Sequence, residues 1–191
     1  MHYDVAIIGG GPGGSATAIA AARAGLRVLL CEKAPYGRDK VCGDGLTPRA
    51  IAALNDLQID HSVAHRIDGL RMIAGKKQRE LAWPTTTRFP NHGGVWPRHR
   101  FDNHLLDVAI AAGAEVRFEC EALPIIEDGR AVGIIAAGQE IRASLVVLAT
   151  GHKEQPQRCL VPFATQMKPS AWQFAPMCQA PDTPSATWRR V

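Results

Sequence analysis

Runs of apolar residues alternate with small-residue stretches along the start of the chain. The run at residues 4–8 predicts a short buried strand, and the GGGPGGS segment after it leads into a small-residue helix that ends near Gly25. A second apolar run, residues 26–33, predicts another strand, with Glu32 near its end. Both strands are almost continuously apolar, as buried parallel strands are. The order strand, helix, strand therefore predicts a parallel βαβ unit.

The later pattern predicts more helices and an antiparallel part. Thr47 and Pro48 have the residue types of a helix N-cap and first helical position, and residues 101–114 carry apolar residues at helical spacing, ending near Gly113. The Asp128-Gly129 pair predicts a hairpin turn within residues 124–135. Other strands are expected at residues 69–74, 79–84, 115–120 and 140–151. The expected fold class is α/β: a Rossmann-like βαβ sheet with an antiparallel β-meander and part of a second sheet, in an incomplete domain.

The periodic pattern of apolar residues is lost after Gly151. We therefore treat residues 1–151 as part of a folded domain and residues 152–191 as a separate, irregular tail. Read one base out of frame, with G or C at most third positions, the codons of Met167–Gln179 give EAVGVAVRAYVS, in which apolar residues alternate as in a strand. Our hypothesis is a frameshift between Gly151 and Met167. On this hypothesis the tail carries no selected function.

Composition excludes several classes of function. The chain has 191 residues, 46% of them apolar, and a net charge of +4 spread over charges of both signs, so we expect a globular protein and no nucleic-acid partner. The sequence shows no apolar run long enough to cross a membrane, and we expect no signal peptide. Five cysteines without a CxxC pair fit a reducing cytoplasm. The seven histidines include one HxxxH spacing, His61 and His65, but no HExxH motif, and we expect no metal site.

A dinucleotide-binding fingerprint joins the first strand to the first helix. Gly9 is expected to permit the tight turn, Gly11 to let the backbone approach a diphosphate, and Gly14 to let the helix pack closely on the sheet. The free N–H groups of the helix N-terminus would face the phosphates. Glu32 stands where a carboxylate accepts hydrogen bonds from ribose hydroxyls and repels a 2′-phosphate, which disfavours NADP.

The fingerprint alone leaves FAD and NAD open, and three later segments favour FAD. The Lys40–Pro48 loop follows the second strand at a distance from which it could return to a flavin. Arg98 stands just ahead of a helix start, and the LVVLATG segment ending at Gly151 is a second strand and turn with small residues.

Five segments together resemble the geranylgeranyl reductase family, flavoproteins with the p-hydroxybenzoate hydroxylase fold. They are GGGPGGS, the EK pair, KVCGDGLTPRAI, RHRFDNHLLDVAIAAGAEV and LVVLATG. The resemblance covers residues 3–151; CGDGLTPRAI is its specific part, because many flavoproteins share the fingerprint. It implies an enzyme that binds FAD and reduces carbon–carbon double bonds of isoprenoid chains in lipids, prenyl quinones or chlorophyll precursors. It also implies an external electron donor, and peripheral contact with the inner face of a membrane is plausible for such substrates.

The resemblance also assigns residues to the cofactor. Gly13 and Gly14 would meet the diphosphate, and Glu32 the ribose. The residues expected to bind FAD are Gly9, Gly11, Gly13, Gly14, Glu32, Lys33, Cys42, Gly43, Gly45, Arg98, Ala122 and Gly151. Residues 67–97 would contribute to the substrate-side sheet.

Cys42 is the candidate catalytic residue. Its thiol could donate a proton to the substrate after hydride transfer, or it could only shape the pocket. Acting as a thiolate would require a lowered pKa, which Lys40 or the flavin environment could supply. Asp44, between two glycines, is interpreted as a turn residue rather than a substrate-side acid. Three aromatic residues, Trp83, Phe89 and Trp96, are interpreted as packing.

Members of that family are about twice this length, and the GD motif of their second half does not follow Gly151 here. Without that half, strands of the substrate-side sheet should expose edges and apolar faces. Two alternatives stay open: an FAD-dependent aromatic monooxygenase or halogenase of the same fold, and a truncated FAD-binding remnant without turnover. A halogenase should carry a tryptophan-bearing motif and a catalytic lysine, which are not found.

Overall fold

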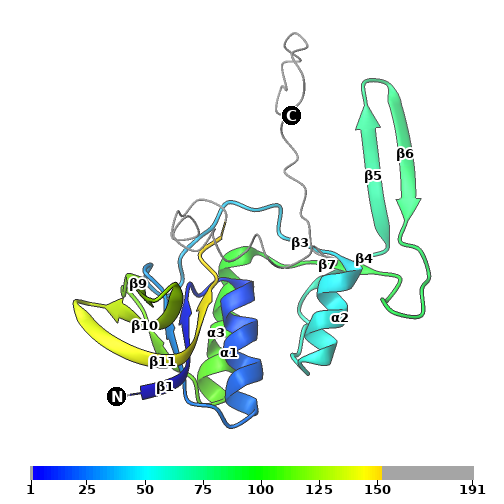
Figure 1. Ribbon diagram of the computed structural model, residues 1–191. Helices are drawn as coiled ribbons and strands as arrows, with labels where there is room; N and C mark the ends of the chain where they lie inside the picture. The colour runs from blue at the N-terminus through cyan, green and yellow to red at the C-terminus, as the bar shows by residue number, and fades with distance from the viewer. Residues whose placement is uncertain (1, 152–191) are drawn as a thin grey trace.

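The computed structural model describes residues 2–151, which form a mixed α/β structure (Figure 1). The six-stranded sheet has the order β8-β2-β1-β11-β10-β9. Its strands and helices are β1 (His2–Ile8), α1 (Pro12–Arg23), β2 (Val28–Cys31), α3 (Arg98–Ala111), β8 (Glu115–Arg117), β9 (Ala122–Glu127), β10 (Arg130–Ala136) and β11 (Gln139–Leu148). The expected α/β class is confirmed. The tail, and the frameshift proposed for it, lie outside the described residues.

The parallel half of this sheet is built around β1. β1 pairs in parallel with β2 on one side and with β11 on the other, with Val5 opposite Val28 and Leu145. β8 extends the parallel part beyond β2. The continuously apolar sequences of β1 and β2 suit this central position because both faces of the strands are covered.

The antiparallel half is the expected meander. β9, β10 and β11 follow one another in the sheet, and the turn between β9 and β10 is formed by Asp128 and Gly129. Both residues have positive φ, 49° and 74°, as the tight hairpin turn requires. The Asp-Gly signal therefore predicted both the hairpin and its turn.

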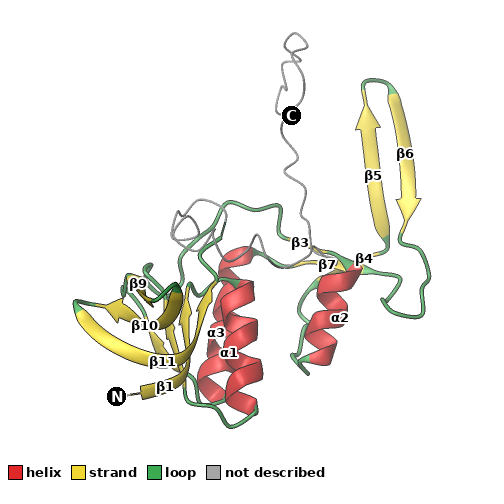
Figure 2. Ribbon diagram, viewed as in Figure 1, coloured by secondary structure: helices red, strands yellow, loops and turns green. Residues whose placement is uncertain are grey.

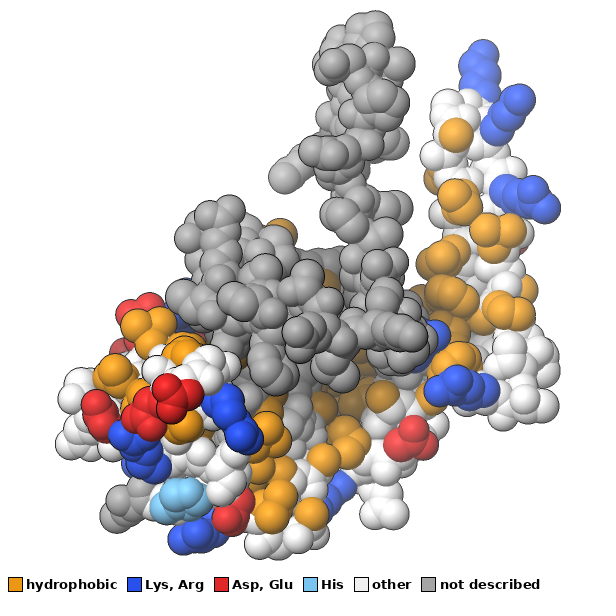
Figure 3. All heavy atoms as spheres, in the orientation of Figure 1, with side chains coloured by type: hydrophobic (Ala, Val, Ile, Leu, Met, Phe, Trp, Pro, Cys, Tyr) orange, Lys and Arg blue, Asp and Glu red, His pale blue; other side chains and the backbone are white. Residues whose placement is uncertain are grey.

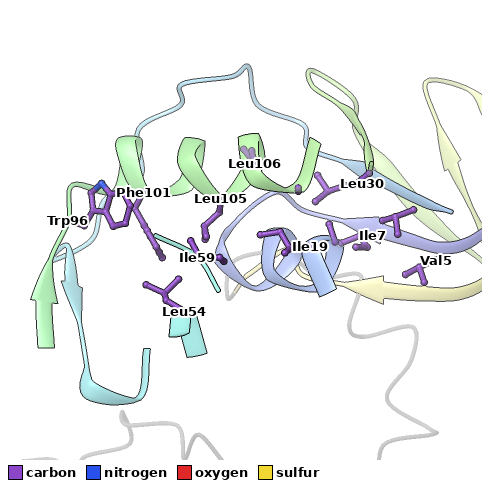
Figure 4. Close-up of a cluster of buried hydrophobic side chains, with 14 of the residues drawn as sticks. Val5, Ile7, Ile19, Leu30, Leu54, Ile59, Trp96, Phe101, Leu105 and Leu106 are labelled. Carbon is purple, nitrogen blue, oxygen red and sulfur yellow. The ribbon is translucent and has the colours of Figure 1, made fainter. Parts of the chain in front are cut away.

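Helices α1 and α3 lie side by side on one face of the parallel strands (Figure 1). Ile7 and Leu30 of the sheet, Ile19 of α1 and Leu105 of α3 are at most 1% exposed and belong to one buried cluster (Figure 4). A second cluster joins the other face of β1 and β2 to the inner side chains of the meander. The six-stranded sheet is thus covered on both faces around β1 and β2.

Residues 45–97 form an outer part with less burial, which we call the outer region. Its elements are β3 (Gly45–Leu46), α2 (Pro48–Asp56), β4 (His65–Ile67), β5 (Gly69–Ala74), β6 (Lys77–Ala82) and β7 (Gly93–Val95). A small sheet has the order β3-β7-β4, and β5 and β6 form a separate hairpin that projects from the rest of the described chain (Figure 2). Of its strands, only β5 and β6 were expected from the sequence, while α2 was expected from Thr47 and Pro48. The other three strands have two or three residues each, too short to leave a periodic pattern.

The β5–β6 hairpin exposes apolar side chains along its length (Figure 3). Leu70, Met72, Ile73 and Leu81 are between 39% and 70% exposed. The expectation of exposed apolar faces in this segment is confirmed for the described residues. Trp96, by contrast, is buried against Phe101, so its interpretation as a packing residue is confirmed.

Helix ends match their sequence signals with one difference. The Thr47 hydroxyl accepts a hydrogen bond from the Ala50 N–H, and Gly25 follows α1 with a φ of 80°, as expected for an N-cap and a C-terminal glycine. Helix α3 begins at Arg98, three residues before its expected start. The reason is a distant cap: the Asp44 carboxylate accepts a hydrogen bond from the Arg98 N–H at 3.0 Å.

Candidate cofactor-binding site

A cavity of about 470 Å³, which we call the cofactor cleft, opens at the carboxyl ends of the parallel strands. Its walls come from the loop after β1, the end of β2 with the loop after it, the segment before β9, and Ala149 and Thr150 after β11. Ligands of open α/β sheets bind at such strand ends. The cleft therefore lies where the fingerprint places a dinucleotide.

The glycines of the loop after β1 are required by close contacts. Gly9 has a φ of 106°, and a Cβ there would lie 2.5 Å from the Ala149 oxygen. A Cβ on Gly14 would overlap the carbonyl oxygen of Gly9. Gly9 therefore forms the tight turn and Gly14 lets α1 approach the loop, the two roles expected from the spacing.

The N-terminus of α1 is open toward the cleft. Gly11 is the N-cap, no side chain caps it, and the first turn carries no acidic residue. Its partial positive charge and free N–H groups suit an anion. A Cβ on Gly13 would meet no described atom within 4 Å, so space is available above this turn.

Glu32 is held in the cleft by backbone donors. It is 6% exposed, and its carboxylate accepts hydrogen bonds from Gly10 N at 2.6 Å and Ala34 N at 3.0 Å. These bonds fix the carboxylate beside the glycine loop. Oxygen lone pairs remain for a ribose hydroxyl, since each carboxylate oxygen can accept two hydrogen bonds.

The sequence did not reveal a connected set of charged side chains that starts at Glu32. We call Glu32, Arg38, Asp102 and Arg98 the charged network. The Arg38 guanidinium lies 3.5 Å from Glu32 and 3.5 Å from Asp102, which is 2% exposed. Arg98 donates two hydrogen bonds to the same Asp102 carboxylate, at 2.8 and 2.9 Å. A buried carboxylate is stable only with such partners. The i,i+4 spacing of Arg98 and Asp102 on α3 was the one available sequence signal.

Arg98 also acts on Cys42. A hydrogen bond to the Arg98 side chain, aided by the backbone N–H of Asp44, lowers the pKa of the exposed Cys42 thiol. Lys40, one of the two expected causes, is not among the groups that lower this pKa. It lines the cofactor cleft and lies beside Gly151. Asp44 itself has a φ of 54°, in agreement with its interpretation as a turn residue.

Cys42 opens onto a second cavity of about 260 Å³, which we call the apolar pocket. Pro12 and Ala16 of α1, the inner side of α2, and Phe101 and Leu105 of α3 form its walls. Arg98 is the one charged residue among its described lining. The thiol therefore stands between a charged network and an apolar surface.

The expected site residues thus fall into two neighbouring groups. Gly9, Gly11, Glu32, Lys33 and Ala122 line the cofactor cleft. Cys42, Gly45 and Arg98 line the apolar pocket. Pro12 belongs to the apolar pocket and follows Gly11 of the cofactor cleft, so both cavities reach the start of α1. Gly43 has open space around it, with no described atom within 4 Å of an added Cβ.

The residues present fit a dinucleotide such as FAD. Besides the glycine loop and Glu32, the cleft contains a buried Thr150 hydroxyl without a hydrogen-bond partner among the described residues. Buried polar atoms are rarely left unpaired, so this hydroxyl is available to a ligand. Cys31 and Cys120 also line the cleft, and burial together with the neighbouring Cys120 raises the pKa of Cys31 to about 12.

Two other features of residues 2–151 bear on function. The described chain contains no cluster of three or more His, Cys, Asp or Glu side chains that could hold a metal ion. None of its helices is long and apolar enough to cross a bilayer.

Comparisons with known proteins agree with this geometry. The chain is 39% identical over 158 residues to the menaquinone reductase of Mycobacterium tuberculosis, covering 78% of this chain and 38% of that protein. It is 37% identical over 160 residues to the digeranylgeranylglycerophospholipid reductase of Thermoplasma volcanium, covering 80% of this chain and 40% of that protein. The chain therefore spans about two-fifths of the length of these relatives.

A solved structure gives the same result. The geranylgeranyl bacteriochlorophyll reductase-like protein of Thermoplasma acidophilum superposes with a TM-score of 0.64 at 35% identity, over 78% of this chain and 39% of that one. The family profile described as FAD dependent oxidoreductase matches residues 4–163. Because this match covers most of the chain, the chain belongs to the FAD dependent oxidoreductase family.

Proposed function

We propose that this chain binds FAD and forms the cofactor-binding part of a reductase that saturates carbon–carbon double bonds of an isoprenoid chain. The supporting observation is identity of 35–39% over most of the chain with proteins named as reductases of menaquinone and of geranylgeranyl lipids. The substrate class would be a lipid, a prenyl quinone or a pigment precursor. Residues 1–151 would be the N-terminal part of the oxidoreductase domain, with residues 67–97 on the substrate side.

The two cavities support a placement in which each half of the cofactor lies toward a different cavity. The adenosine half would lie in the cofactor cleft, with its ribose on Glu32 and Lys33 and Ala122 beside it. The diphosphate would lie over Gly11 and Gly13 at the start of α1, next to the tight Gly9–Gly14 contact. These assignments follow from the direction of the glycine loop and from the position of Glu32.

The flavin half would lie toward Cys42, Gly43, Gly45 and Arg98, and Gly151 would close the cleft beside Lys40. FAD, when bound, supplies the hydride chemistry of the reaction. The Cys42 Sγ would hold the proton that the reduced substrate carbon requires. Arg98 lowers the pKa of this thiol toward neutral pH, where a general acid works best.

Three features of the reaction are also proposed. The electrons would come from an external donor, and an isoprenoid substrate would bring the protein to the inner face of a membrane for peripheral contact, in the cytoplasm. The apolar pocket beside Cys42 suits an apolar substrate. The alternatives remain an aromatic monooxygenase of the same fold, and an FAD-binding remnant without turnover.

Flavin binding is the direct test. The purified chain should bind FAD, seen as a flavin absorbance band that stays with the protein on gel filtration and is bleached by dithionite. The Gly11→Val variant should lose the band because its side chain would stand where the diphosphate approaches. The Ala111→Val variant, at the exposed end of α3 opposite to Arg98, adds a branched side chain away from the cleft and is the control.

A turnover assay distinguishes the reductase from the monooxygenase and from the remnant without turnover. Reduced flavin that is reoxidised on addition of a geranylgeranyl lipid or menaquinone, with a saturated product by mass spectrometry, supports the reductase. Hydroxylation of an aromatic substrate would support the monooxygenase. Bound flavin that is reoxidised by neither would leave the remnant, and a colourless chain would refute the proposed function.

A further inference from the structure

Among residues 2–151, Arg38 is the cation whose contacts join the glycine loop to the charged network. It lies in the loop after β2, its side chain is 18% exposed, and it lines the cofactor cleft. A Cβ built on Gly11 would lie 3.7 Å from the Arg38 Nη2 atom. The guanidinium is therefore next to the N-cap of α1, where the cofactor diphosphate is proposed to lie.

Both ion pairs of Arg38 are long, and its carboxylate partners have closer donors. Arg38 lies 3.5 Å from Glu32 and from Asp102, and within residues 2–151 its side chain forms no hydrogen bond. Glu32 already accepts two backbone hydrogen bonds, and Asp102 is held by Arg98 at 2.8 and 2.9 Å. The N–H groups of Arg38 are thus free for a ligand, and its movement would leave neither carboxylate without a partner.

The surroundings of Arg38 favour an anion. The start of α1 contributes partial positive charge without an acidic side chain in its first turn. The Thr150 hydroxyl, buried and unpaired among the described residues, lines the same cleft. An arginine beside such a helix start matches the geometry of a phosphate group, which accepts two parallel N–H bonds from one guanidinium.

We infer that Arg38 binds the diphosphate of the cofactor and exchanges its two long ion pairs for charge-assisted hydrogen bonds to phosphate oxygens. This inference rests on the proposed function and adds to it a residue outside the set expected from the sequence. Arg38 would hold the diphosphate from the loop side, opposite the N–H groups of α1.

Titration with cofactor fragments tests the inference without turnover. Calorimetry measures the affinity of the chain for ADP, AMP, adenosine and FAD. The Arg38→Met variant should bind ADP and FAD about tenfold or more weakly, because a charge-assisted bidentate contact is lost, while adenosine binding changes less than about twofold. The Arg38→Lys variant should recover part of the ADP affinity, because lysine keeps the positive charge but lacks the paired N–H donors of the guanidinium.

The controls separate binding from folding. Arg79→Met, on the exposed β6 strand, removes the same side chain far from the cleft and should leave all four affinities unchanged. Thermal unfolding shows whether Arg38→Met is folded. If it is not, Arg38→Gln, which keeps a polar side chain without the charge, takes its place, and unchanged ADP affinity there overturns the inference.

Two further outcomes would refute it. Equal losses for adenosine and ADP in Arg38→Met would show a structural role through Glu32, and unchanged ADP affinity would show that Arg38 does not touch the diphosphate. In either case FAD binding by the original chain would leave the proposed function intact. An original chain that binds neither FAD nor ADP would remove the proposed function itself, and the inference with it.

Discussion

The cofactor region, formed by the six-stranded sheet with α1 and α3, and the outer region at residues 45–97 differ in how they bury apolar side chains. Ile7 on β1 is 0% exposed, whereas Ile73 on β5 is 70% exposed. Both residues lie in strands of similar length with good strand-forming sequences. The difference lies in neighbours: β1 has a strand on each side and side chains packed on both faces, while among the described strands β5 pairs with β6 alone.

This comparison shows that strand propensity and stable packing are separate properties. A two-stranded hairpin alone is marginal in water, because it buries too little surface to offset the loss of chain entropy. The cofactor region meets its own packing requirements among the described residues. The β5–β6 hairpin does not bury its apolar side chains against any other described element, so they form an exposed apolar surface.

The largest expected effect tests this difference with one substitution in two places. Ile7→Ala should lower the free energy of unfolding by about 2–5 kcal/mol, because it leaves a cavity in a closely packed core. Ile73→Ala should change it by less than about 0.5 kcal/mol, because the side chain is solvated. Chemical denaturation measures both. A cost for Ile73→Ala near that of Ile7→Ala would show that the hairpin is covered in solution, and the comparison would fail.

A smaller effect is expected within the cofactor region, where the space around neighbouring glycines differs. Gly14→Ala should cost about 1–3 kcal/mol, because its Cβ overlaps the Gly9 oxygen and the loop must shift. Gly13→Ala, one residue earlier, should stay within about 1 kcal/mol of the original chain, since open space surrounds the position and alanine favours the helix. Thermal unfolding of the two variants provides the measurement. Equal costs would contradict the contact described between α1 and the loop.

The smallest effect concerns Cys42, where the two regions meet. The rate of Cys42 alkylation by iodoacetamide should rise with pH around a midpoint below that of an ordinary cysteine, because the Arg98 hydrogen bond lowers the thiol pKa. Arg98→Met should move the midpoint to higher pH, and Arg98→Lys should move it less. Peptide mass spectrometry identifies the modified cysteine.

The control for this profile is Arg38→Met, which leaves Arg98 and its contacts with Asp102 and Cys42 in place. Its midpoint should match that of the original chain. A midpoint that moves as far as in Arg98→Met would assign the low thiol pKa to the whole charged network rather than to Arg98 alone.

The sequence predicted the cofactor region well because its signals are local. The glycine spacing between Gly9 and Gly14, the Asp128-Gly129 turn and the Thr47 cap each determine structure through residues a few positions away. Glu32 could be placed because the end of a strand after the glycine loop has a fixed position in a βαβ unit. The resemblance to flavoenzyme reductases added the segment around Cys42.

The charged network could not be predicted because its members meet only through the fold. Arg38 comes from a loop without periodicity and Asp102 from a helix, and nothing in either segment indicates the other. The distant cap formed by Asp44 and Arg98 is of the same kind, and it explains why α3 starts earlier than its apolar spacing suggested. The short strands β3, β4 and β7 are likewise set by tertiary pairing rather than by their own sequences.

The pairing of β1 with β11 also has a consequence for synthesis. Val5 lies opposite Leu145, so one edge of β1 can be paired only when almost all of the described chain has been made. At about 5–20 residues per second, the intervening stretch of about 140 residues takes about 7 to 28 seconds to translate. During that interval the apolar β1–β2 pair would present a bare strand edge to the crowded cell. Ribosome-bound chaperones that shield nascent chains would have their greatest effect on yield in this window.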